Sequence, residues 1–214
     1  MSQDLENIFN SFTNEKVPDR WLDNTLGYPC LKPLSSWYAD LLKRFEFMRD
    51  WLDNGPPMSY WIPAFFFPQG FMTATLQTFA RKTQTPIDTL TFRTNILPFY
   101  RKDVDHTPET GVNIHGLFMQ GAKWDFNKKS VEDSDPKVAI VPFPVIWLEP
   151  IEEKDFVKDL KKYQCPLYKT STRAGELSTT GHSTNFVLYI ELPSNEYPDV
   201  WIRRGTALLC MTDD

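Results

Sequence analysis

The stretch Phe186–Leu192, FVLYIEL, decides the fold of the second half of the chain. Its apolar residues fall at every second position, and Tyr189 and Glu191 lie between the last three of them. A period of two places successive side chains on opposite faces of a strand, so that one face packs against a core and the other meets solvent. The stretch therefore predicts a β-strand with one buried face.

Five more segments between residues 91 and 211 have a similar pattern, and turn residues (Pro, Gly, Asn and Asp) separate them. They are residues 91–97, 112–120, 137–148, 163–170 and 200–211. Six strands predict an incomplete, mostly antiparallel β-barrel or a curled sheet. The polar residues 127–136 predict a solvated loop, and residues 152–162 predict one short amphipathic helix.

The first half of the chain has the period of helices instead. Apolar residues recur every three or four positions in residues 4–16, 34–54 and 69–82, and proline or Asn54-Gly55 follows these segments. The middle segment has one apolar stripe, formed by Leu34, Trp37, Leu41, Phe45, Met48 and Leu52. The sequence thus predicts an α+β protein, with a helical subdomain in residues 1–90 and a β-barrel subdomain in residues 91–214, packed as one unit.

The composition argues against several classes of protein, namely nucleic-acid-binding, membrane, disulfide-bonded and zinc proteins. The 214 residues include 23 basic and 28 acidic side chains, a net charge of −5, which gives no general attraction to nucleic acid or to anionic membranes. No signal-peptide pattern and no apolar run of ~18 residues is present. The three cysteines, Cys30, Cys165 and Cys210, are far apart and form no C-x-x-C pair, which indicates a reducing setting without disulfides or a zinc site. We expect neither nucleic acid nor a membrane as a partner.

Two segments contain residues that are typical of nucleotide-binding or catalytic motifs, but neither segment matches the complete motif. Gly116 to Trp124, GLFMQGAKW, resembles a phosphate-binding loop, but Ala122 stands where that loop needs lysine and Trp124 where it needs a hydroxyl, so strand-and-turn packing is favoured. His182 lies among serines and threonines, yet no nucleophile elbow accompanies it, so a hydrogen-bonded turn is favoured. His106, His115 and His182 are too far apart to form a local metal motif. We therefore expect no catalytic, cofactor or metal residues.

Aromatic and basic side chains offer candidates for an interface. The stretch 59–68, SYWIPAFFFP, holds Trp61, Phe65, Phe66 and Phe67, and exposing all four would cost ~1.5 to 3 kcal/mol each. We expect this cluster at the seam between the helices and the barrel, with part of it left for a partner. Basic side chains near strand ends are usually solvated and could meet an acidic partner; they are Lys169, Arg173, Arg203 and Arg204.

Several blocks from Val17 onward resemble the C-terminal domain of dynein heavy chains. They include VPDRW, YPCLKPLSSWYADLLKR, FFFPQGFMTATLQTFARK, GVNIHGLFMQGAKWD, PVIWLEP and WIRRGTALLC, in this order. The most specific block is YQCPLYKTSTRAGELSTTGHSTNFV, whose completeness is more similar to axonemal than to cytoplasmic heavy chains. Pro63-Ala64 departs from the smaller residues expected before FFFPQG. The resemblance implies a piece excised from the C-terminus of a much longer protein.

The resemblance also implies a function. The fold would be a helical bundle followed by an incomplete, mostly antiparallel barrel, and the parent would be an ATP-driven microtubule motor of the ciliary or flagellar axoneme. ATP and magnesium would bind in the parent's AAA+ ring, and this fragment would hold no cofactor and catalyse nothing. It would dock on the ring of the same heavy chain and tune motility. Two other hypotheses stay open: an adaptor for another axonemal protein or dynein subunit, and a hydrolase that uses His182.

Overall fold

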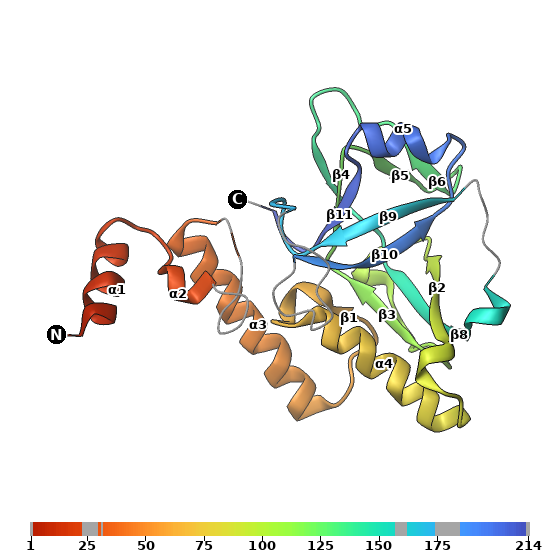
Figure 1. Ribbon diagram of the computed structural model, residues 1–214, viewed down its shortest axis with the longest axis horizontal. Coiled ribbons are helices and arrows are strands. Elements are labelled where there is room, and N and C mark those ends of the chain that lie inside the picture. Colours follow the sequence, from red (N-terminus) through yellow and green to blue (C-terminus); the bar gives the residue numbers. More distant parts are fainter. Residues whose placement is uncertain (1, 23–29, 31, 157–161, 174–184, 213–214) are drawn as a thin grey trace.

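The computed structural model describes residues 2–22, 30, 32–156, 162–173 and 185–212 (Figure 1). Both helices and strands are present in this part of the protein, so the α+β class is confirmed. The α-helices are α1 Gln3–Thr13, α2 Asp19–Leu22, α3 Leu34–Asn54, α4 Pro68–Thr83 and α5 Pro198–Arg203. The strands are β1 Tyr60–Trp61, β2 Leu90–Ile96, β3 Val112–His115, β4 Phe118–Gln120, β5 Lys123–Asp125, β6 Ser130–Glu132, β7 Ile140–Pro142, β8 Ile146–Glu152, β9 Tyr163–Tyr168, β10 Phe186–Leu192 and β11 Ala207–Leu209.

The described strands form three sheets. One has the order β1-β3-β8-β2, a second has the order β10-β9-β11-β4-β7, and β5 pairs with β6. The longest ladder joins β2 and β8 in antiparallel register from Leu90 opposite Glu152 to Ile96 opposite Ile146. Pairing is antiparallel except between β1 and β3 and between β9 and β11. Because β1 lies in the first half of the chain, both halves contribute to the first sheet.

The two larger sheets meet along shared backbone segments. β3 runs into β4 through Gly116, and beside this turn the Phe143 amide donates to the Leu117 carbonyl at 2.8 Å. On the other side of the sheets, the Thr94 hydroxyl of β2 donates to the Glu191 carbonyl of β10, also at 2.8 Å. No backbone ladder joins β2 to β10 among the described strands, and no closed barrel is found in that part of the protein.

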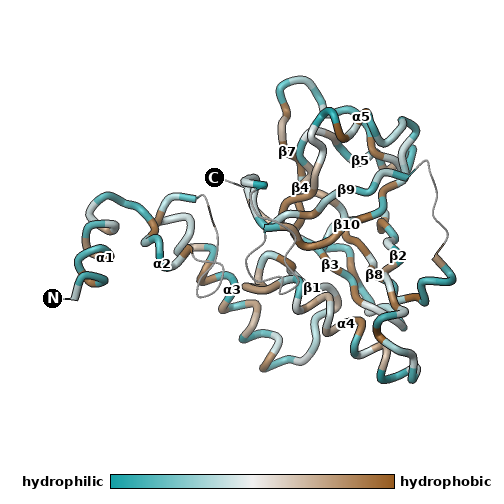
Figure 2. The backbone as a smooth tube through the Cα atoms, in the orientation of Figure 1, coloured by the Kyte–Doolittle hydropathy of each residue, from teal (hydrophilic) through white to brown (hydrophobic). Residues whose placement is uncertain are grey.

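The main core lies between the sheets and under α4. Its fully buried side chains come mainly from the strands, and α4 adds Met72. Figure 2 shows apolar positions gathered along these strands. The largest side chains of this core that are completely buried are Ile62, Ile114, Leu117, Met119, Ile146, Leu148, Leu167, Ile190, Leu192, Trp201 and Leu208. This core holds most of the buried apolar surface and fixes the strands in register.

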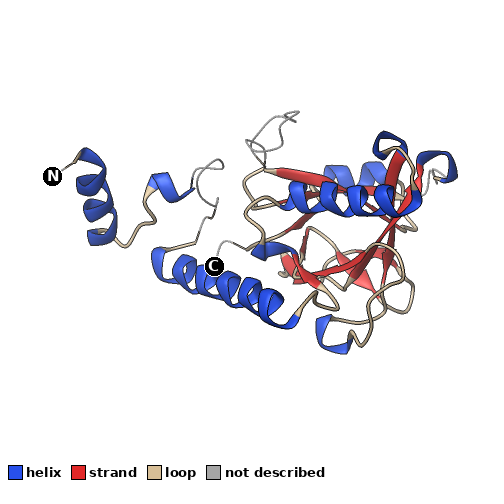
Figure 3. Ribbon diagram, turned by 90° about the horizontal axis from the view of Figure 1, so that it is seen from below, coloured by secondary structure: helices blue, strands red, loops and turns tan. Residues whose placement is uncertain are grey.

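A second, smaller core joins α2 and α3. It consists of Val17, Cys30, Trp37 and the C-terminal Met211, and Trp21 stacks on Trp37 with ring centroids 5.2 Å apart. In Figures 1 and 3 the segment α1 to α3 extends away from the sheets, and we call it the arm. α1, at its end, has no buried residue. β1 precedes α4 and α5 precedes β11, so helices and strands alternate at these points, and a helical bundle followed by a barrel, with a division at residue 90, stays a prediction.

The prediction of one strand over residues 200–211 is wrong. Residues Pro198–Arg203 form α5, and only Ala207–Leu209 form a strand. Proline at the first helical position and Asp199 in the first turn favour a helix start. Gly205, with φ of +64°, then turns the backbone into β11. These capping residues outweigh the apolar pattern.

Other boundaries also differ from the predictions. The segments 112–120 and 137–148 each contain two strands, and β6 lies within the predicted loop 127–136. In the segment 152–162 the structure has a single 3₁₀ turn at Glu153–Asp155, and residues 157–161 lie outside the described part. Glu191, placed by its pattern on the solvent face of its strand, is buried instead, with Lys162 paired to its carboxylate at 2.9 Å. A register shift near Phe186 also places Val187 in the core.

Candidate docking surfaces

The aromatic cluster of residues 61–67 lies mainly at the seam between α3, α4 and β1. The Phe65 ring lies 4.4 Å from Phe71 of α4 and 6.2 Å from Phe47 of α3, and Trp61 also contacts Phe47 at 6.3 Å. Trp51 of α3 also packs against Phe65, with the two ring centroids 6.1 Å apart. Trp61 and Phe65 are half-buried and join α3 to the rest of the fold. Their ring contacts are with Phe47, Trp51 and Phe71 of the two helices, and a role for part of the cluster in binding a partner stays a prediction.

Phe66 and Phe67 differ in their surroundings. The Phe67 ring packs so closely on Gly70 that a Cβ there would come within 2.4 Å of it. Phe66 is 42% exposed, and the Arg44 guanidinium lies 5.8 Å from its ring centroid. Arg44 itself is buried, and burial lowers its pKa to about 9, which leaves it charged at neutral pH. Of the four aromatic candidates, Phe66 presents the most surface to a partner.

Two of the basic candidates are held within the molecule. Lys169 is expected in solvent from the sequence, and that expectation is wrong: it is only 3% exposed, and burial lowers the pKa of its ammonium group. Arg173 is exposed but donates to the Gln120 side chain at 2.7 Å and to the Gly205 carbonyl at 2.5 Å. It also lies over the Tyr168 ring. Arg173 therefore connects the segment after β9 to the end of β4 and to the turn before β11.

Arg203 and Arg204 lie at the end of α5. Arg204 pairs with Asp133 and lies 5.2 Å from the Trp201 ring centroid, so much of its charge is balanced within the molecule. Arg203 is exposed, as are the apolar side chains of Tyr197 and Ile202 on and beside the same short helix. The structure thus separates the four basic candidates, and of these Arg203 is the one most available to an acidic partner.

An exposed apolar face on the arm does not follow from the sequence pattern. On α3, Tyr38, Leu42, Phe45 and Leu52 are 45–86% exposed, although Phe45 and Leu52 belong to the predicted stripe. Trp37 of the stripe is buried and Leu34 and Leu41 pack beside it, and the inward side also includes Arg44 and Trp51, seven and fourteen residues after Trp37. The pattern misses Arg44 because arginine is rarely buried. The two tryptophans, fourteen residues apart in the sequence, were the available signal.

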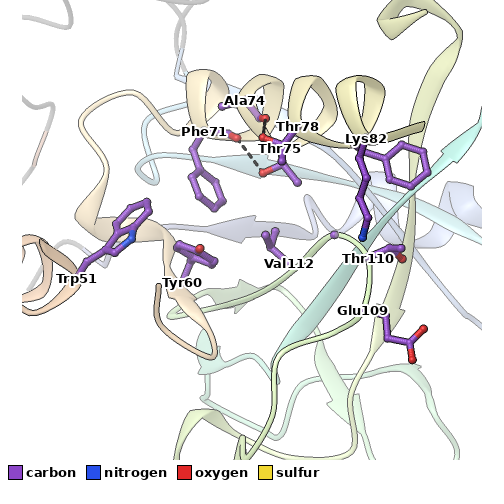
Figure 4. A pocket seen from close by; sticks show the side chains of 12 residues that line it. Trp51, Tyr60, Phe71, Ala74, Thr75, Thr78, Lys82, Glu109, Thr110 and Val112 are labelled. Atoms are coloured by element: carbon purple, nitrogen blue, oxygen red, sulfur yellow. Dashed lines mark hydrogen bonds between the residues drawn. The ribbon is translucent and has the colours of Figure 1, made fainter. Parts of the chain in front are cut away.

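A hollow of about 400 Å³ lies between α4 and the turn before β3 (Figure 4). Its wall is apolar and includes Tyr60, Phe71 and Val112, while Lys82 and Glu109 lie at its edge (Figure 4). The Thr75 hydroxyl donates to the Phe71 carbonyl of its own helix at 3.0 Å, so it offers little to a ligand. The hollow suits an apolar group, and its described lining lacks a nucleophile paired with a base.

The histidines occupy different surroundings. His115 is buried and hydrogen-bonded to Ser59 at 2.9 Å; burial, and then the charge of Arg101, lower its pKa to about 4. His106 is exposed beside Asp105, and this contact holds the pKa of the Asp105 carboxyl below its usual value. His182 lies outside the described residues. Within the described ranges, no group of three His, Cys, Asp or Glu side chains could hold a metal ion.

Residues 116–124, which resemble a phosphate-binding loop, form strands and turns, and this agrees with the interpretation that the sequence favoured. Gly116 and Gly121 have φ of +87° and +76° and separate β3, β4 and β5. The Lys123 ammonium pairs with Asp135.

In the part of the protein that the structure describes, no helix is both long and apolar enough to cross a bilayer.

The sequence is similar to known proteins over its whole length. The family model for the C-terminal domain of the dynein heavy chain matches residues 1–210. Dynein axonemal heavy chain 1 of Mus musculus is 48% identical over 213 residues, dynein axonemal heavy chain 3 of the same species 46% over 215, and dynein axonemal heavy chain 6 of Homo sapiens 45% over 234. These alignments span 100% of the present sequence and 5–6% of each relative. The protein therefore belongs to the family of C-terminal domains of dynein heavy chains.

Proposed function

We propose that this protein is the C-terminal domain of an axonemal dynein heavy chain, and that it docks on the AAA+ ring of the same heavy chain and tunes ATP-driven motility. The observation that carries the proposal is the family match over residues 1–210, together with 45–48% identity to axonemal heavy chains. The expected location is the axoneme of a cilium or flagellum. ATP and magnesium would bind in the ring, and this domain would contribute docking energy only.

A modest interface is sufficient for such a role. If the domain binds one ring conformation ~1.4 kcal/mol more tightly than another, the ratio of the two conformations shifts about tenfold. Exposed apolar residues on the arm would supply this energy, because burying one Phe or Leu contributes about 1.5–3 kcal/mol.

The test compares the motor with and without residues 1–214. The ring and stalk are kept the same, and the microtubule-stimulated ATPase rate and run length are measured on single molecules. We expect both to change, while electron microscopy shows an intact ring. An unchanged rate and run length with an intact ring would refute the regulatory role.

A second candidate function is an adaptor for another axonemal protein. It is favoured by α5, where Tyr197 and Ile202 are exposed next to the charged Arg203. Replacing Tyr197 and Ile202 by serine would then release an axonemal protein from the motor without changing its ATPase rate. Retention of every subunit by the double variant would count against this function.

A further inference from the structure

We propose that the hollow between α4 and the turn before β3 binds a small amphipathic carboxylate, with its apolar body inside the hollow and its carboxylate next to Lys82 at the edge. The site goes beyond docking on the ring, because its ligand is a small molecule. The hollow has a volume of about 400 Å³. Pockets that bind small molecules usually have volumes of about 300–1,000 Å³.

The wall of the hollow suits an apolar body. It includes the rings of Tyr60 and Phe71 and the side chain of Val112 (Figure 4). The hydroxyls of Thr75 and Thr78 donate to carbonyls of their own helix at 3.0 and 2.8 Å, so they do not need a hydrogen bond from water or from a ligand. Water in this hollow finds few partners, and an apolar body that displaces it is favoured.

The aromatic side chains of the wall hold one another in place. The Tyr60 ring centroid lies 4.9 Å from that of Phe71 and 5.1 Å from that of Trp51. Phe71 in turn lies 4.4 Å from Phe65, which belongs to the seam between the helices. A ligand that enters the hollow therefore has few side chains to order, and this reduces the entropy cost of binding.

The turn on the other side of the hollow is fixed as well. The Thr110 carbonyl accepts a hydrogen bond from the Trp147 indole of β8 at 2.8 Å. Gly111 has φ of +74°, and a Cβ at this position would overlap the Leu148 carbonyl oxygen of the same strand. The turn thus packs directly against β8, which keeps it apart from α4 and makes the hollow a preformed feature of the fold.

The charges at the edge favour an anionic head group. Lys82 lies in the last turn of α4, and its ammonium group reaches across the edge of the hollow toward Thr110 (Figure 4). Glu109 is the other charged residue of the described lining, and its carboxylate points away from the hollow (Figure 4). Neither side chain forms an ion pair with a described residue. One cation therefore faces the hollow, and it matches the single negative charge of a carboxylate.

Photoaffinity labelling of the intact recombinant heavy chain tests the site. The probe is decanoic acid with a diazirine at the end of its chain, and mass spectrometry identifies the labelled peptides. We expect label in the peptides that contain Tyr60, Phe71 or Val112. Decanoate should displace the probe at a concentration at least ~3-fold lower than decyltrimethylammonium, which has the same chain and the opposite charge.

Variants at the edge test the role of charge. Lys82→Gln is expected to abolish the preference for decanoate, and Lys82→Glu to reverse it. Lys82→Arg keeps the positive charge and should keep the preference. Glu109→Gln is the matched control, because it removes a charge at the same edge that does not face the hollow. Val112→Trp fills the hollow and should remove the label from these peptides.

Three results would overturn the proposal. No label at the hollow of the intact motor would mean that another part of the protein fills it. Equal displacement by the two competitors, or tighter binding of the cation to the aromatic rings, would exclude an anionic ligand. An unchanged preference in Lys82→Gln would show that Lys82 does not select the head group. Each result is independent of the ATPase rate, so the site and the regulatory role stand or fall separately.

Discussion

At the scale of single residues, the burial of His115 makes the stability of the folded protein depend on pH. Its ring is hydrogen-bonded to Ser59, which is fully buried, and its pKa is lowered to about 4 from an ordinary value near 6.5. The folded state thus favours the neutral ring. The stabilisation is complete above pH 6.5, where the unfolded ring is also neutral, and is lost as the pH falls toward 4.

We therefore expect the free energy of unfolding to decrease by on the order of 2–3 kcal/mol between pH 6.5 and pH 4 because of His115. His115→Asn keeps a hydrogen-bonding group and cannot be protonated in this range. Urea unfolding of both proteins at several pH values gives the difference between their profiles. If the two profiles are parallel between pH 6.5 and pH 4, His115 is not the cause.

Gly116 shows a different constraint at the same scale. It has φ of +87°, and a Cβ at this position would come within 2.3 Å of the Trp61 indole. Gly55 has the same φ of +87° but open space around it. The two glycines therefore separate backbone strain from a steric clash.

Gly116→Ala is expected to destabilise the protein by about 1–3 kcal/mol more than Gly55→Ala, because only the former displaces the Trp61 ring. Chemical unfolding measures both changes. Equal losses of unfolding free energy would mean that strain at φ alone determines the cost, and that Trp61 moves aside freely.

At the scale of elements, α3 presents an inward and an outward face within a few residues. Phe47 contacts the rings of Trp51, Trp61 and Phe65, whereas Phe45 is 60% exposed. In the 214-residue protein, Phe47→Ala is expected to lower the unfolding free energy by about 2–3 kcal/mol, and Phe45→Ala by less than about 0.5 kcal/mol. Thermal or urea unfolding tests both. A large loss with Phe45→Ala would show that this side chain packs within the domain.

A helix or strand was predictable where its hydrophobic pattern extended over seven or more residues. The alternation in residues 186–192 and the helical spacing in residues 34–54 both correspond to described elements, β10 and α3. Two- and three-residue strands such as β1 and β6 were not predictable, because a period cannot be seen in so few positions. α5 was not predictable either, because the residues that bound it, Pro198 and Gly205, are equally typical of turns between strands.

The candidate surfaces were predictable only in part, for a related reason. A sequence shows that an aromatic cluster must avoid water, and Trp61 and Phe65 indeed lie in a seam. It does not show whether an apolar stripe packs inside its own domain or on a partner. Phe45 and Trp37 share one stripe in the sequence, yet one is exposed and the other buried. Likewise, lysine is usually solvated, so nothing in the sequence indicated that Lys169 would be buried.

At the scale of the whole molecule, the two ends of the sequence meet in the small core of the arm. Met211 follows β11, packs with Val17 and Trp37, and its sulfur lies 3.6 Å from the Arg44 guanidinium. Among the described residues, Met211 is the one member of this small core that comes from the C-terminal half, so it is a principal link between the arm and the sheets. Met119, by contrast, lies in the main core between the sheets. These two methionines allow the coupling between the cores to be measured.

Met211→Ala is expected to loosen the arm selectively, because large-to-small changes in a core cost about 2–5 kcal/mol and the arm can open without the sheets. Hydrogen exchange should become faster in residues 33–44 and stay slow in β9 and β10, whereas Met119→Ala should make exchange faster throughout the protein. Faster exchange in β9 and β10 with Met211→Ala would mean that both cores unfold as one cooperative unit. In that case, a partner that binds the exposed apolar residues of the arm would stabilise the sheets as well, and its binding energy would be shared by the whole domain instead of being confined to the arm.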